Sequence, residues 1–126
     1  MKAATGLLLS VAALAACIGT PPLSQSDAGS RGVAVVQDLA GHRWDAVAAQ
    51  FDDTMKKAVS PIQLDQVWTS AEVTHGPYQG HSSPEVVYRG DLAVVDIAAT
   101  FGGAKDDCRI TFDPDGKIAG FYLLRM

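Results

Sequence analysis

Apolar residues in the first half of the chain recur every three to four positions, which is the spacing of one face of an α-helix. Three segments show this spacing, at residues 33–40, 44–55 and 61–75. The third segment begins after Ser60, which is followed by a proline and then, at the third helical position, by Gln63. Because this order combines an N-cap, a first-turn proline and a capping box, it predicts that the third helix starts at residue 61.

The second half of the chain changes to the two-residue alternation of β-strands. Strands are predicted at residues 85–89, 91–101, 107–112 and 118–124. Turn sequences separate the last three of them, a glycine pair at 102–103 and Asp-Pro-Asp-Gly at 113–116. Helices followed by strands indicate an α+β fold. We therefore predict three N-terminal helices packed on one face of an antiparallel sheet of about four strands.

The beginning of the chain has the order of residues found in an export signal. Lys2 precedes an apolar run at residues 7–13, and small residues then lead to Leu14-Ala15-Ala16-Cys17. The run is shorter than the roughly 20 residues of a transmembrane helix, and it fits a signal peptide. Leu-Ala-Ala-Cys resembles the lipobox of bacterial lipoproteins, which implies that residues 1–16 are removed and that Cys17 carries a diacylglyceryl group. Cleavage by a general signal peptidase, leaving Cys17 as a thiol, is the alternative.

The rest of the chain divides into a tether and one domain. Residues 17–30 are rich in Pro, Ser and Gly and lack periodicity, so we predict a lipidated Cys17 followed by a flexible tether with a reach of roughly 20 Å. Residues 31–126 are long enough for one hydrophobic core. The formal charge is −4 and no basic cluster is present, which argues against nucleic acid as a partner. Cys108 is predicted to be a small buried side chain.

Four short sequences in this domain together resemble one protein family. They are Phe51-Asp52-x-x-Met55, Leu64-x-x-x-Trp68, Gly76 before the first strand, and Phe112-Asp113-x-Asp115-Gly116-Lys117-Ile118-x-Gly120. They look like a bacterial domain family of the nuclear transport factor 2-like superfamily, also called cystatin-like or ketosteroid-isomerase-like. The resemblance implies a curved sheet wrapped on helices into a cone with a pocket at its open end, and it implies no activity. Some members precede serine α/β-hydrolases, but this chain lacks their Gly-x-Ser-x-Gly motif.

The candidates for lining such a pocket are Trp44, Phe51, Trp68, His75, Tyr78, Tyr88 and Tyr122. Core packing is the competing interpretation for the residues that keep helical spacing. Asp96 interrupts an apolar strand, and the alternation places it on the outer face of the sheet with Thr100. We expect no cofactor and no metal site, because His75 and His81 have no third ligand nearby. The sequence at 113–116 lacks the glycine position and final glutamate of a calcium loop.

These observations favour a non-catalytic binding module in the cell envelope. Lipid on Cys17 would hold it at the outer face of the cytoplasmic membrane, with the outer membrane as the alternative, and it would bind a small apolar ligand or a protein partner. One alternative is a small isomerase or dehydratase, with Asp96 or His75 as proton shuttle and a tyrosine as oxyanion donor. Another is a structural or partner-binding domain that forms a homodimer.

Overall fold

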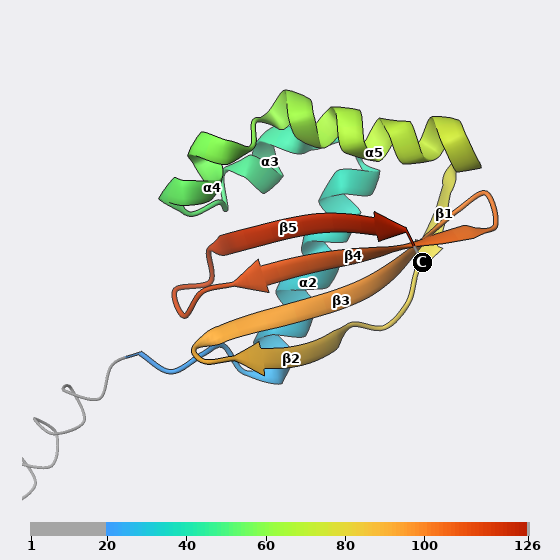
Figure 1. Ribbon diagram of the computed structural model, residues 1–126. Helices are drawn as coiled ribbons and strands as arrows, with labels where there is room; N and C mark the ends of the chain where they lie inside the picture. The colour runs from blue at the N-terminus through green and yellow to red at the C-terminus, as the bar shows by residue number, and fades with distance from the viewer. Residues whose placement is uncertain (1–19, 126) are drawn as a thin grey trace, which may run out of the picture.

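The computed structural model describes residues 20–125, in which helices come first and strands follow (Figure 1). The helices are α2 (Gln25–Ala40), α3 (Trp44–Ala48), α4 (Asp53–Ala58) and α5 (Pro61–His75). The strands are β1 (Tyr78–His81), β2 (Glu85–Arg89), β3 (Leu92–Phe101), β4 (Ala104–Phe112) and β5 (Ile118–Arg125). Within these residues no helix is long and apolar enough to cross a membrane. The predicted signal peptide and Cys17 lie outside the described residues.

The five strands form one antiparallel sheet centred on β3. β4 and β5 follow on one side of β3. β1 and β2 share the other side, where β1 pairs with the C-terminal part of β3 and β2 with its N-terminal part. Figure 1 shows α2 crossing behind the sheet and the shorter helices and α5 gathered along its β5 edge, with no described helix in front. One face of the sheet is therefore covered and the other is open.

The covered face and the helices enclose a core that is filled by side chains. Its largest completely buried members are Trp68, Phe51, Phe101 and Phe112. Each such side chain stabilises the fold by about 1.5–3 kcal/mol relative to an exposed position. Large side chains thus pack in the space between helices and sheet where the cone hypothesis expects a ligand, and a smaller hollow remains beside the C-terminal half of α5.

The prediction of three helices on about four strands is wrong, and one reason is that the predicted helix at residues 44–55 is divided into α3 and α4. Between them Phe51 forms a parallel bridge with Ile118. The Asp52 N–H donates to the Ile118 carbonyl at 2.9 Å, and the Ile118 N–H donates to the Gln50 carbonyl at 2.8 Å. A main chain that is hydrogen-bonded to a distant strand cannot continue the helical ladder. The apolar spacing persists across the break because both short helices face the same core.

The number of strands is wrong because β1 lies in the predicted loop between the third helix and the sheet. Its four residues include Gly80, so the sequence shows almost no alternation there. β1 exists through pairing with the end of β3, where Tyr78 lies opposite Phe101 and Gly80 opposite Thr100. β4 also begins at Ala104, three residues before the predicted start.

The predicted tether is too long at its C-terminal end. α2 begins at Gln25, and the Ser24 side chain caps it by accepting a hydrogen bond from the Asp27 N–H at 3.1 Å. Ala28 and Gly29 are buried in this first part of the helix. The small residues that suggest a flexible segment are instead the ones that let α2 approach the rest of the fold closely.

Where the signals are local, the predictions are confirmed. The Ser60 side chain accepts from the Gln63 N–H while the Gln63 side chain accepts from the Ser60 N–H, which completes the capping box of α5. The turn between β4 and β5 also lies where expected, with the Gly116 N–H donating to the Asp113 carbonyl at 3.0 Å.

Candidate functional site

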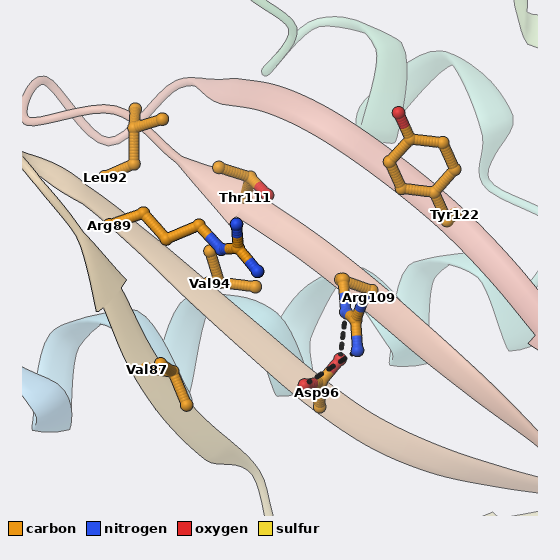
Figure 2. A pocket seen from close by; sticks show the side chains of 8 residues that line it. All are labelled: Val87, Arg89, Leu92, Val94, Asp96, Arg109, Thr111 and Tyr122. Carbon is orange, nitrogen blue, oxygen red and sulfur yellow. Dashed lines mark hydrogen bonds and ion pairs between the residues drawn. The ribbon is translucent and has the colours of Figure 1, made fainter.

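The open face of the sheet carries a hollow of about 450 Å³ over β2, β3, β4 and β5 (Figure 2). It is lined by Val87, Arg89, Leu92, Val94, Asp96, Arg109, Thr111 and Tyr122. These residues stand at alternate positions because side chains two apart on a strand share a face. The pairing of the strands brings them together, since Val94 lies opposite both Val87 and Thr111 and Arg109 lies opposite Tyr122.

The middle of this sheet hollow is apolar. Val94 is only 7 % exposed although it faces away from the core, because side chains from the neighbouring strands stand around it. Val87 on β2 and Tyr122 on β5 flank it and remain exposed at 56 % and 60 %. An apolar group resting on Val94 would therefore remove apolar surface on several strands from water, which favours binding.

One end of the sheet hollow carries a network of charges. The Arg109 Nε donates to Asp96 Oδ1 at 2.8 Å, and one Nη reaches the second carboxylate oxygen at 3.5 Å and Asp107 at 3.7 Å. Hydrogen bonding to Asp96 raises the pKa of Arg109. Partial burial, reinforced by Asp96, raises the pKa of Asp107. Arg109 is therefore already neutralised by its neighbours.

The other end of the sheet hollow carries Arg89, whose guanidinium lies over the floor near Val94 and Thr111 (Figure 2). Among residues 20–125 no hydrogen bond or ion pair engages this guanidinium. Thr111 and Tyr122, which both carry hydroxyl groups, line the same space. A planar guanidinium offers several N–H donors in the geometry that matches a carboxylate or phosphate. The arrangement can hold an anionic group next to an apolar one.

Two of the seven predicted pocket residues, Phe51 and Trp68, belong to the core, and Tyr78 packs against it. Phe51 and Trp68 are each 1 % exposed. The Trp68 ring lies 4.9 Å from the Phe101 ring and 5.5 Å from the Tyr78 ring, measured between centroids. Burial raises the pKa of Tyr78. For Phe51 and Trp68, which keep helical spacing, the core-packing interpretation is the correct one.

The other four predicted residues lie in separate places. Trp44 stacks on the exposed His42 ring at a centroid distance of 5.0 Å. The Tyr88 hydroxyl donates at 2.8 Å to the main-chain carbonyl of residue 23, before α2. His75 lies in the last turn of α5, and Tyr122 is the one predicted residue that lines the sheet hollow. The structure therefore does not gather the predicted residues into one site.

The titratable residues considered in the sequence have clear positions. Asp96 lies on the outer face, as the alternation predicts, and is held by Arg109. Cys108 is completely buried, as predicted, and this burial raises the pKa of its thiol, which makes it a poor nucleophile. Within residues 20–125 no group of three His, Cys, Asp or Glu side chains is placed to hold a metal ion.

Reasoning from the sequence missed Arg89 and the apolar floor, although a signal for them exists. The outward positions of the first and second predicted strands should be polar in a sheet that faces water on one side. Here they include Val87, Leu92 and Val94. Apolar residues at outward positions beside an arginine were the detectable sign of a binding surface.

Comparison with known protein families identifies the family of this chain. A family model described as "protein of unknown function (DUF3887)" matches residues 33–121, which is most of the chain. The chain therefore belongs to this family. The comparisons with curated proteins and with solved structures found no match. The resemblance to the nuclear transport factor 2-like superfamily stays a prediction.

Proposed function

We propose that this protein is a lipid-anchored extracytoplasmic binding module that holds a small anion with an apolar part in the sheet hollow. The anchor is inferred from Leu14-Ala15-Ala16-Cys17 and the apolar run before it. The observation that carries the binding role is the Arg89 guanidinium, which has no partner in the described chain and lies beside an apolar floor. The protein would act at the cell envelope, and no reaction is assigned to it.

The size and charge of the sheet hollow support a small anionic ligand. Its volume of about 450 Å³ falls within the roughly 300–1,000 Å³ of small-molecule sites. Arg109 is bonded to Asp96, so Arg89 is the lining cation that remains for a ligand. The apolar part of the ligand would rest on Val94 while Tyr122 covers one side.

The isomerase or dehydratase alternative receives less support. Such an enzyme needs an acid or base that points into a closed, apolar pocket within reach of a second polar group. Asp96, the first of the two proton shuttles considered, lies on the open face and is bonded to Arg109 at 2.8 Å. His75, the second, lies at the end of α5 with its Nε2 3.1 Å from the Arg125 guanidinium. Pairing of two copies through the same open face is the other alternative, and the experiment below separates it from ligand binding.

Replacing Arg89 with glutamine is expected to weaken the binding of pentanoate about tenfold, because a hydrogen bond to a charged group contributes about 1.5–3 kcal/mol. Binding of 1-pentanol, which has the same apolar chain without the charge, should not change. Titrations of the full chain in detergent, followed by the Nε–Hε resonance of Arg89 and the methyl resonances of Val94, measure both affinities.

Lys57→Gln is the matched control, because it removes one positive charge from the exposed side of α4. Equal losses for Arg89→Gln and Lys57→Gln would mean that only net charge matters and would contradict the proposal. Native mass spectrometry tests for a dimer that persists when pentanoate is present. If such a dimer forms and the methyl resonances of Val94 show that it shields this residue, the open face is an interface between copies instead.

The anchor is tested by the intact mass of the protein from bacterial membranes. We expect the wild-type protein to lack residues 1–16 and to carry a diacylglyceryl group on Cys17, and we expect Cys17→Ser to lose the lipid and leave the membrane. Cys108→Ser is the control and should keep the lipid, because its side chain is buried in the domain. An unmodified Cys17 in the wild type, or cleavage before Ala16, would refute the anchor.

A further inference from the structure

A second hollow, of about 190 Å³, lies on the covered side of the sheet, where the C-terminal half of α5 meets β4 and β5. Figure 1 shows the C-terminal ends of α5 and β5 on the same side of the molecule. Its polar lining comes from Ser70, Thr74 and His75 on α5, from Asp106 on β4 and from Arg125 on β5. We call it the α5 hollow, and none of these five residues contributes to the sheet hollow.

Asp106 gives the α5 hollow its chemistry. It is 6 % exposed, and it is the one buried charged residue in the described part of the chain. Its Oδ1 atom is buried without any hydrogen-bond partner among the described residues. An unpaired buried carboxylate is costly, so such groups are normally bonded to a donor or to a cation.

The neighbouring cation does not satisfy this carboxylate. Arg125 lies opposite Asp106 in the pairing of β4 with β5. Its guanidinium instead lies 3.1 Å from His75 Nε2, and no ion pair with Asp106 forms. Because a guanidinium has five N–H donors, this single contact leaves others for a ligand. The α5 hollow therefore presents an acceptor inside and donors at its edge.

We propose that the α5 hollow binds a small zwitterion, whose ammonium group bonds to Asp106 and whose carboxylate bonds to Arg125. A carboxylate accepts only, so the inner group of the ligand must donate. The hydroxyl groups of Ser70 and Thr74 can accept further hydrogen bonds from the ammonium group. Leu123 also lines the hollow and offers an apolar contact for a short aliphatic side chain of the ligand. A cation alone would meet the positive charge of Arg125, whereas a zwitterion balances both charges.

Alanine is the probe for this proposal, and its two halves are the controls. In titrations of the full chain in detergent, followed by amide resonances of Ser70 and Thr74, alanine should bind at least tenfold more tightly than ethylamine or propionate. Trimethylglycine carries the same charges but has no N–H donor, so it should bind no more tightly than propionate. The proposal is overturned if ethylamine or trimethylglycine equals alanine, or if no probe gives saturable shifts and the hollow holds only water.

Two substitutions separate the site from a general charge effect. Asp106→Asn should weaken alanine binding at least tenfold, whereas Asp107→Asn, one residue later and on the other face of β4, should leave it unchanged. Since Asp106→Asn removes a buried charge, we expect it to fold, and thermal unfolding checks this. If it does not fold, Arg125→Gln at an exposed position provides the same test. Equal effects of the Asp106 and Asp107 substitutions would refute the proposal, and neither result bears on Arg89 and the sheet hollow.

Discussion

Replacing Trp68 with alanine is expected to lower the free energy of unfolding by about 3–5 kcal/mol, the range found for removal of a buried aromatic ring. Trp68 is 1 % exposed and packs against the rings of Phe101 and Tyr78. It thereby joins α5 to two strands of the sheet, so a cavity at this place loosens both layers. Urea denaturation followed by circular dichroism measures the loss.

Two substitutions serve as controls for this core prediction. Trp44→Ala removes a ring that is only partly buried and stacks on an exposed histidine, so we expect a loss below about 2 kcal/mol. Trp68→Phe keeps most of the ring, and the Nε1–H that it removes has no partner in the described chain, so the loss should be below about 1.5 kcal/mol. Equal losses for Trp68→Ala and Trp44→Ala would show that the core is not built around Trp68.

Replacing Gly102 with alanine is expected to lower the free energy of unfolding by about 2–4 kcal/mol, which combines the left-handed backbone with steric overlap. Gly102 has φ +53°, and a Cβ there would fall on the carbonyl oxygen of His75 and 2.9 Å from the Cα of Gly76. Its N–H also donates to the Pro77 carbonyl at 3.0 Å. The turn between β3 and β4 thus touches the end of α5 through main-chain atoms, which have little freedom to move away.

Gly103→Ala is the matched control for this turn. Gly103 has φ +93° but no atom within 4 Å of the added Cβ, so only the backbone conformation opposes the substitution. We expect a loss of about 1–2 kcal/mol. Thermal unfolding of both variants measures the difference, and a Gly102→Ala protein as stable as Gly103→Ala would mean that α5 does not end against this turn.

The parts of the fold that local signals define could be predicted from the sequence. Ser60, Pro61 and Gln63 define the start of α5 because their hydrogen bonds are made within one turn. The break at Phe51 could not be predicted, because the bridge to Ile118 joins residues far apart in the sequence. The same holds for β1, which pairs with β3. Such pairing is decided by the whole sheet and not by the residues of one segment.

The residues of the two candidate sites likewise include some whose positions the sequence predicts and others whose positions depend on pairing and packing. Alternation alone places Asp96 on the outer face of the sheet, but only the register of β3 with β4 places Arg109 beside it. Alternation also identifies Val87 and Val94 as apolar residues on the open face. Asp106 stands in the same alternation as Cys108 and Ile110, but it precedes the predicted strand at residues 107–112. Only the observed extent of β4 and the position of α5 show that it is buried.

The sequence by itself determined the order of helices before strands, the face on which Asp96 lies and the prediction of lipid on Cys17. These depend on spacing and on residues adjacent in the chain. Only the tertiary structure decided that large side chains pack between helices and sheet, that Arg89 lies over an open apolar floor, and that Asp106 Oδ1 is buried with no hydrogen-bond partner among the described residues. The physical reason is that burial and pairing belong to contacts between distant segments, which form only when the elements pack together.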